Sequence, residues 1–175
     1  MRVLMHSCCA PCSTFSLALM RSMGYSVSAL FVNPNIYPEH EGEKRWLTLW
    51  EFASLEGMPV CRVEVGHEKW LETVSADLAK PGRCVLCYRT RLDETARRAR
   101  DEGFQYFTTS LLLSIYQDHD AIVREAREAS RRHSVEFLYF DFRKGYRRSR
   151  EMARGKHLYM QKYCGCEFSL RGENR

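Results

Sequence analysis

Short apolar runs alternate along the chain with longer stretches whose apolar residues recur at a helical period. Each apolar run predicts a strand, and the runs cover residues 2–6, 26–32, 60–65, 105–110 and 136–140. The stretches between them predict helices over residues 13–23, 39–56 and 88–102, and from Asp118 or Asp120 to Arg132. Strands that alternate with helices in this way indicate an α/β fold, a Rossmann-like parallel sheet with helices on both faces.

Two of the predicted helices carry more detailed expectations. Gly24 follows the first helix and is typical of the residue that ends a helix in a left-handed conformation. In the second helix an apolar stripe is expected to bury against the sheet, and its members are Trp46, Leu49, Trp50 and Ala53. The chain shows no internal repeat or linker, so we expect one domain that spans residues 1–175.

The cysteines add chemistry to this pattern. Seven of the eight fall in three clusters, Cys8-Cys9-Ala10-Pro11-Cys12, Cys84-Val85-Leu86-Cys87 and Cys164-Gly165-Cys166. The apolar run after Arg2 is too short for a signal peptide, and no apolar stretch reaches the roughly 18 residues of a membrane helix. We therefore expect a cytoplasmic protein with no membrane partner. In that compartment, clustered thiols indicate metal ligands or redox catalysts.

The first two clusters lie where α/β folds place their sites. Cys8 and Cys9 follow the first predicted strand, and Cys84 and Cys87 lie in the predicted loop before the helix that begins at Tyr88. Ligands of open parallel sheets bind at the carboxyl ends of the strands, and a helix start there stabilises thiolates. The pattern thus predicts a cysteine-rich metal site at the carboxyl ends of the strands.

Three chemistries are open for these thiols: a structural zinc site, a thioredoxin-like thiol exchanger and an iron–sulfur cluster. Successive side chains of an extended strand point to opposite faces, so Cys8 and Cys9 share one centre only if the backbone turns there. Otherwise they serve two centres, and Cys12 is then a candidate ligand for a second metal. Cys164 and Cys166 either complete a metal shell or form a labile, catalytic disulfide across Gly165.

The net charge of +5 is concentrated near the C-terminus. Residues 143–162 hold eight Lys or Arg residues and a single acid, Glu151, which is a local excess of seven positive charges. Such a segment is either a solvated helix face or a surface that binds the phosphates of a nucleic acid.

Longer motifs surround these residues in order along nearly the whole chain. They are His6-Ser7-Cys8-Cys9-Ala10-Pro11-Cys12-Ser13, Phe31-Val32-Asn33-Pro34-Asn35-Ile36-Tyr37-Pro38, Arg83-Cys84-Val85-Leu86-Cys87-Tyr88-Arg89, Phe107-Thr108-Thr109-Ser110 and Gln161-Lys162-Tyr163-Cys164-Gly165-Cys166. In this combination the sequence resembles the QueH family, the cobalamin-independent epoxyqueuosine reductases. A Cys-x-x-Cys pair alone would not support that resemblance.

The resemblance implies a reaction and a cofactor. The reaction is a two-electron reduction that removes the epoxide oxygen of epoxyqueuosine at the wobble position of tRNA and gives queuosine, with an electron donor still unidentified. The implied cofactor is a [4Fe–4S] cluster, and its implied ligands are Cys8, Cys9, Cys84 and Cys87. The resemblance also allows an additional iron beside the cluster. The resemblance also implies a redox-active pair at Cys164 and Cys166.

The implied tRNA substrate is a binding partner for the basic segment of residues 143–162. An anticodon arm presents phosphates and unstacked bases, which basic and aromatic side chains hold, and Tyr159 and Tyr163 lie beside the basic residues. This favours phosphate binding over a solvated surface, and the candidate tRNA-binding residues are Arg147, Arg148 and Lys162.

Other polar residues are weaker candidates. A proton for the leaving oxygen could come from His6, Asp118, His119 or Asp120, although His6 also suits the buried end of a strand and Asp118 a helix cap. Asn33, Asn35 and Tyr37 follow the second predicted strand and are candidates for substrate binding, although Asn-Pro-Asn is also common in turns.

Two functions from other classes compete with the reductase. One is a zinc-bound RNA-binding protein without catalytic activity, which a colourless protein after anaerobic purification would indicate. The other is an ATP-dependent enzyme of the tRNA thiolation type, which shares the predicted fold. The phosphate loop of such enzymes is normally rich in Ser and Gly, and this chain has cysteines at that position, which argues against it.

Overall fold

Five parallel strands form the centre of the molecule in a computed structural model that describes residues 1–172. The strands are β1 (Arg2–His6), β2 (Ser26–Phe31), β3 (Val60–Arg62), β4 (Tyr106–Thr109) and β5 (Glu136–Phe137). Their order across the sheet is β3-β2-β1-β4-β5, and every neighbouring pair is parallel. The central strand β1 is buried on both faces, as its continuous apolar sequence predicts.

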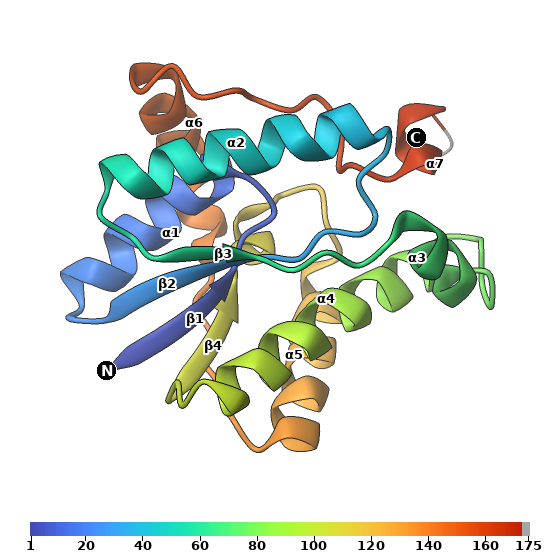
Figure 1. Cartoon of the computed structure of the whole chain (residues 1–175), viewed down its shortest axis with the longest axis horizontal. Coiled ribbons are helices and arrows are strands. Elements are labelled where there is room, and N and C mark those ends of the chain that lie inside the picture. Colours follow the sequence, from blue (N-terminus) through green and yellow to red (C-terminus); the bar gives the residue numbers. More distant parts are fainter. Residues whose placement is uncertain (173–175) are drawn as a thin grey trace.

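Helices cover both faces of this sheet. They are α1 (Ala10–Ser22), α2 (Glu39–Leu55), α3 (His67–Val74), α4 (Gly82–Asp101), α5 (His119–His133), α6 (Tyr146–Gly155) and α7 (Glu167–Leu170), with 3₁₀ turns η1 (Ser110–Leu113) and η2 (Phe142–Gly145). Helices α1, α2 and α6 lie on one face, and α4 and α5 lie on the other (Figure 1). The predicted Rossmann-like α/β fold is therefore confirmed.

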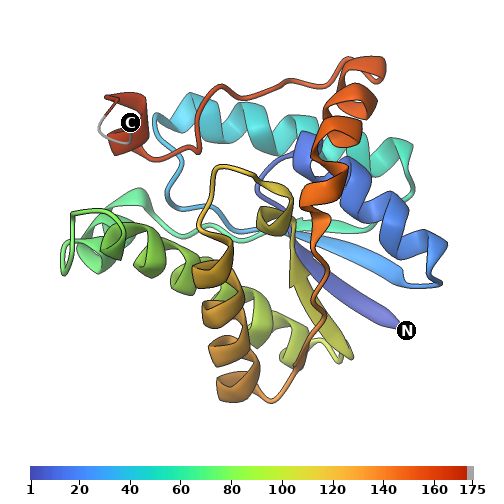
Figure 2. The same cartoon turned by 180° about the vertical axis from the view of Figure 1, so that it is seen from behind.

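The strand order places a crevice at the carboxyl end of β1. Strand β2 pairs with one edge of β1, and β4 pairs with the other edge. The loops after β1 and β4 therefore diverge to opposite faces of the sheet. Open α/β sheets bind ligands at such a switch point. The segment between α6 and α7 then crosses the same region beside α2, as Figure 2 shows from behind.

Several element boundaries differ from the prediction. Strand β3 ends at Arg62 and β5 ends at Phe137, and both are edge strands of the sheet. Helix α4 begins at Gly82 instead of Tyr88, so Cys84 and Cys87 lie in its first turns and not in the loop before it. Pro81 precedes that first turn, where its missing N–H costs no hydrogen bond.

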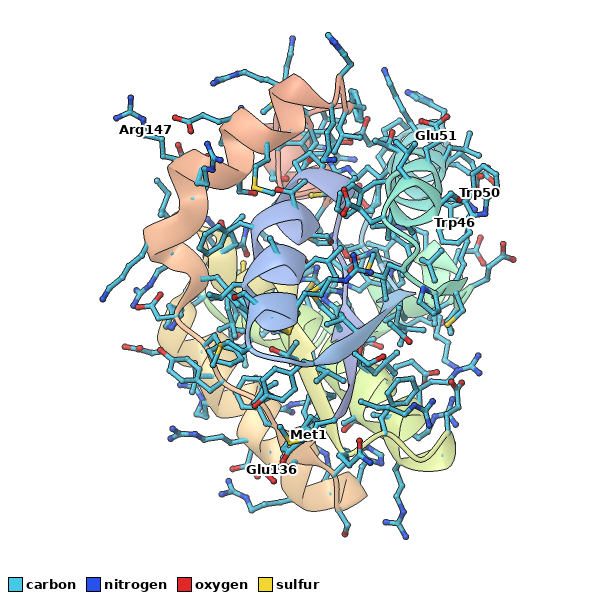
Figure 3. All side chains as sticks on the ribbon, turned by 90° about the vertical axis from the view of Figure 1, so that its left-hand side faces the viewer. Met1, Trp46, Trp50, Glu51, Glu136 and Arg147 are labelled. Atoms are coloured by element: carbon cyan, nitrogen blue, oxygen red, sulfur yellow. The ribbon has the colours of Figure 1, made fainter. Side chains whose placement is uncertain are left out.

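The predicted burial of Trp50 is wrong. Its side chain is 52% exposed on the outer side of α2 (Figure 3), whereas Leu49 and Ala53 are buried as predicted. The inner face of α2 is rotated away from Trp50, because Arg45 and Phe52 both lie buried against the protein. An arginine can take part in that face because its charge is paired with an acid on the same helix.

Two capping predictions are confirmed. Gly24 follows α1 with a φ of +83°, and the Asp118 carboxylate accepts a hydrogen bond of 2.9 Å from the backbone N–H of Ala121 at the start of α5. Within residues 1–172, none of the helices combines the length and the apolar character needed to cross a membrane.

Candidate functional site

The loop after β1 brings three thiols together. Cys9 is the residue before α1 and has an extended backbone, and Pro11 occupies the first turn. The backbone turns here, so the Sγ atoms of Cys8 and Cys9 are 3.7 Å apart. With Cys12, one helical turn later, they form a group whose sulfur atoms all lie within 4.8 Å of one another. Because the backbone turns, Cys8 and Cys9 can share one centre.

Hydrogen bonds distribute charge unevenly over this thiol group. The pKa of Cys8 is lowered well below its usual value, because the thiols of Cys12 and Cys9 both donate to its sulfur. Burial raises the pKa of Cys9, and the hydrogen bond that Cys12 gives to Cys8 raises the pKa of Cys12. The hydroxyl of Ser110, the first residue of η1 after β4, lies 3.4 Å from the Cys8 sulfur and accepts from the Cys8 N–H at 3.0 Å. The group therefore concentrates negative charge on Cys8.

The second thiol pair lies on α4. Cys84 and Cys87 are three residues apart on the helix, so both point to one side of it, and burial raises the pKa of both thiols. Arg91 shares this face one turn later, is only 4% exposed and donates to the Cys87 carbonyl oxygen at 3.2 Å. A buried guanidinium here favours negative charge on the neighbouring sulfurs. The recurrence of Cys84, Cys87 and Arg91 on one helix face is a sequence signal that our prediction missed.

The third thiol pair lies between α6 and α7. The Sγ atoms of Cys164 and Cys166 are 3.6 Å apart, and Gly165 between them has a φ of +122°. The hydrogen bond from Cys164 lowers the pKa of Cys166 to about 5, whereas the pKa of Cys164 is raised. Cys166 packs with Cys87 and with Trp70 of α3 in one small apolar cluster. The pair therefore combines one readily ionised sulfur with one protonated sulfur.

A buried ion pair holds this last segment in place. Arg45 of α2 is paired with Glu41 at 2.8 Å, and it donates to the carbonyl oxygens of Tyr163 and Cys164. The hydroxyl of Tyr159 donates to the other oxygen of Glu41 at 2.7 Å. This support was not predicted, because nothing local in the sequence distinguishes Arg45 from a solvated helical arginine.

All three thiol clusters face one cavity of about 330 Å³. The cysteines that line it are Cys8, Cys12, Cys84, Cys87, Cys164 and Cys166. Cys9 lies buried next to Cys8, and the lone Cys61 lies on β3 away from the cavity. None of the eight cysteines, all within residues 1–172, forms a disulfide. The structure thus gathers segments that are far apart in the sequence around one volume.

The three predicted tRNA-binding residues lie in two different places. Lys162 lines the cavity, together with Arg150. Arg147 and Arg148 lie on the exposed side of α6, where Arg147 points away from the protein (Figure 3). Both lie within 3.5 Å of Glu151, which offsets part of their charge. Lys162 is therefore next to the thiols, and the two arginines form a surface outside.

The four candidate acids do not line the cavity. His6 is fully buried, bonded to Thr109 and Asn33, and burial lowers its pKa to about 4. Asp118 caps α5, and His119 bonds to the hydroxyl of Tyr139. The structural interpretations of His6 and Asp118 are confirmed.

The structure also separates the three candidates after β2. Asn33 is committed to the fold, because it donates to the Ser7 carbonyl oxygen at 2.9 Å and bonds to His6. Tyr37 is 42% exposed and stacks on His67 outside the cavity. Asn35 is the one of the three that lines the cavity, and it is 2% exposed.

Comparisons with known proteins agree along almost the whole chain. The family described as epoxyqueuosine reductase QueH matches residues 3–172. An epoxyqueuosine reductase QueH from Dehalococcoides mccartyi is 35% identical over 169 residues, which cover 96% of this chain and 92% of that protein. The epoxyqueuosine reductase QueH of Thermotoga maritima is 33% identical over 176 residues, which cover 96% of this chain and 90% of that protein.

Solved structures share the fold at much lower identity. A predicted subunit of tRNA methyltransferase from Methanocaldococcus jannaschii aligns with a TM-score of 0.63 and 13% identity, over 100% of this chain and 89% of that chain. The U34-tRNA thiolase NcsA from Methanococcus maripaludis, solved with its [4Fe–4S] cluster, aligns with a TM-score of 0.59 and 15% identity, over 99% of this chain and 64% of that chain. These likenesses show the fold alone, whereas the end-to-end sequence match shows that the chain belongs to the QueH family of epoxyqueuosine reductases, which are oxidoreductases.

Proposed function

We propose that this protein reduces the epoxide of epoxyqueuosine at the wobble position of tRNA to give queuosine, with an iron–sulfur cluster and a redox-active cysteine pair. One observation carries the proposal: six thiols from three distant segments line a single cavity. Family membership supplies the reaction, and the cavity supplies the place for it. It also favours a reductase over the zinc-bound RNA-binding protein and the thiolation-type enzyme.

The donor set suits an iron–sulfur cluster. Such clusters are held by cysteine thiolates, and this cavity has thiols from the β1 loop and from α4, with the buried charge of Arg91 beside them. The proposed ligands are Cys8, Cys9, Cys84 and Cys87. Cys12 lies within the same thiol group and is our candidate ligand for an additional iron. When bound, a cluster of this kind would supply electron transfer, and an additional iron with an open coordination position would supply a Lewis acid for the epoxide oxygen.

The C-terminal pair can supply the reducing equivalents. Closure of the Cys164–Cys166 dithiol to a disulfide releases two electrons and two protons. An epoxide needs the same two electrons and two protons to become an alkene and water, so the reaction balances. The short distance between the two sulfurs and the left-handed glycine between them support closure of this small ring. An external thiol or electron-transfer protein, not yet identified, must then reopen the disulfide in every turnover.

The surface around the cavity suits the loop of a tRNA anticodon arm. Lys162 and Arg150 put positive charge on the cavity wall, and Tyr116, which also lines it, is 77% exposed. An exposed aromatic ring beside basic residues is a platform on which an unstacked base can lie. Arg147 and Arg148 extend the basic surface along α6, where phosphates of the adjoining stem would bind.

We further propose that residues 1–175 act as one domain in the cytoplasm. A dithiol that must be reopened in each cycle requires a reducing compartment, and the cysteines without disulfides fit such a place.

Anaerobic purification tests the whole proposal. We expect a coloured protein that contains iron and sulfide and converts epoxyqueuosine to queuosine in tRNA when a reductant is supplied. A colourless zinc protein that binds RNA without turnover would contradict it. Conversion that depends on ATP and inserts sulfur would instead support the thiolation-type enzyme.

A further inference from the structure

Two buried amide oxygens in the cavity wall have no hydrogen-bond partner among the described residues. They are Oδ1 of Asn35 and Oε1 of Gln161, and both residues line the cavity. An unpaired buried acceptor is costly, so a protein that retains two of them in one cavity has a use for a donor there. A donor carried by a molecule that enters the cavity can complete these hydrogen bonds.

Within residues 1–172, the amide oxygen of Asn35 makes no hydrogen bond that holds the fold together. Asn33, two residues earlier, is also buried, yet its amide is bonded to the Ser7 carbonyl oxygen and to His6. Asn35 instead lies against the thiol segment, because a Cβ built on Gly165 would be 3.1 Å from its Nδ2 atom. Its side chain therefore stands next to the residue that separates Cys164 from Cys166.

Gln161 places the second acceptor near the other thiols. Its Nε2 lies 2.7 Å from the sulfur of Cys9, and an amide that donates through Nε2 turns its oxygen away from that sulfur. The two orphan acceptors thus belong to one amide beside the redox-active pair and one amide beside the thiol group of the β1 loop. Neither of these two oxygens is hydrogen-bonded to any of the described residues.

We propose that Asn35 and Gln161 bind the hydroxyl groups of the modified base. This inference rests on the proposed function, whose substrate carries a cyclopentane ring with two adjacent hydroxyl groups beside the epoxide. Hydroxyl groups donate to amide oxygens, and a site built to hydrogen-bond a hydroxyl strongly disfavours a ligand that lacks it. The two amides therefore select the modified wobble base over plain guanine and hold its ring against the thiols.

A ribose 2′-hydroxyl is a second source of the same donor, and the experiment separates the two. Binding of an anticodon stem-loop is measured with the anaerobically purified, metal-loaded protein. One stem-loop carries queuosine, which keeps the ring hydroxyls and does not turn over, and the other carries guanine at the same position. The variants are Asn35→Ala and Gln161→Ala, with the acceptor-retaining Asn35→Asp for comparison. Gln105→Ala is the matched control, because Gln105 is an exposed glutamine just before β4 and outside the cavity.

We expect wild-type protein to prefer the queuosine stem-loop, and each alanine variant to lose roughly three- to tenfold of that preference. Asn35→Asp should retain most of it, and Gln105→Ala all of it. An unchanged preference in both alanine variants would overturn the inference, as would equal weakening on both stem-loops, which would assign the amides to ribose. Iron content is measured for every variant as a check that it folds and is loaded with metal. If Asn35→Ala fails this check, the result for Gln161→Ala decides the inference.

Failure of the proposed function gives a different result. In that case wild-type protein neither reduces epoxyqueuosine nor distinguishes the two stem-loops. Wild-type turnover combined with a preference that the variants leave intact would instead remove only the assignment of Asn35 and Gln161.

Discussion

Arg45 Nη1 donates a hydrogen bond of 3.1 Å to the carbonyl oxygen of Cys164, which joins the inner face of α2 to the C-terminal thiol pair. The segment around Cys164 has no regular secondary structure to satisfy its backbone. The buried guanidinium has several fixed N–H donors, and it supplies the backbone carbonyl oxygens with hydrogen bonds that a helix or sheet would otherwise provide. Arg45 is thus a positioning residue for the pair.

Replacement of Arg45 should separate stability from positioning. Arg45→Ala should lower the free energy of unfolding by about 3–5 kcal/mol, because it leaves the Glu41 carboxylate buried without its partner. Arg45→Lys keeps the charge but loses the fork that reaches two carbonyl oxygens, so we expect it to fold with full iron and to turn over more slowly. Urea unfolding, iron analysis and turnover measure these effects. Arg62→Ala, whose ion pairs lie near solvent, is the control, and unimpaired turnover of Arg45→Lys would contradict the role.

Single cysteine replacements should divide the thiols by role. Serine at Cys8, Cys9, Cys84 or Cys87 should strip or distort the cluster and severely lower activity, because serine is a poor ligand for iron–sulfur clusters. Metal analysis and the visible spectrum of anaerobic protein give the readout. Cys61→Ser is the matched control, since Cys61 lies outside the cavity. A Cys84→Ser protein with full iron, sulfide and turnover would refute the ligand assignment.

Cys12→Ser tests the additional iron. Because Cys12 belongs to the thiol group but is not a proposed cluster ligand, its replacement should remove only that iron and leave the spectrum of the cluster intact. Loss of the whole cluster would show that Cys12 is itself a cluster ligand.

The C-terminal pair should behave as a redox couple. Cys166→Ala should keep its iron and spectrum but lose multiple turnover, because no disulfide can form. Reduced wild-type protein treated with substrate should yield one disulfide between Cys164 and Cys166 per product, as mass spectrometry can count. Loss of iron in the variant would make these thiols ligands. Normal turnover would mean that electrons reach the epoxide without them.

Binding to tRNA should depend steeply on salt. Each phosphate-binding residue replaced by alanine should reduce the slope of log affinity against log salt by roughly one. We expect this for Lys162→Ala and for the double variant Arg147→Ala/Arg148→Ala, although Glu151 reduces the effect of the two arginines. Titrations at several salt concentrations provide the slope, with Arg97→Ala on α4 as the control. An unchanged slope in the double variant would reduce that part of α6 to a solvated surface.

Local pattern determined the architecture and the general place of the site. The period of apolar residues predicted five strands and four of the helices between them in the correct order, because burial on a sheet face is encoded by neighbours a few positions apart, but it missed α3. The position of Cys8 and Cys9 after β1 followed from that order, since parallel strands bring their carboxyl ends to one edge. Short edge strands and the early start of α4 were not determined in this way, because both depend on contacts with other elements.

The tertiary structure alone decided which residues meet. Cys12 lies with Cys8 and Cys9 because the backbone turn after β1 brings the three sulfur atoms close together. Cys87 packs with Cys166 because the chain after α6 returns across the sheet. The same folding committed Asn33 to the core and left the oxygen of Asn35 unpaired in the cavity. Sequence periodicity carries no distance between segments this far apart, so the direction of a side chain and its partner are set only when those segments pack.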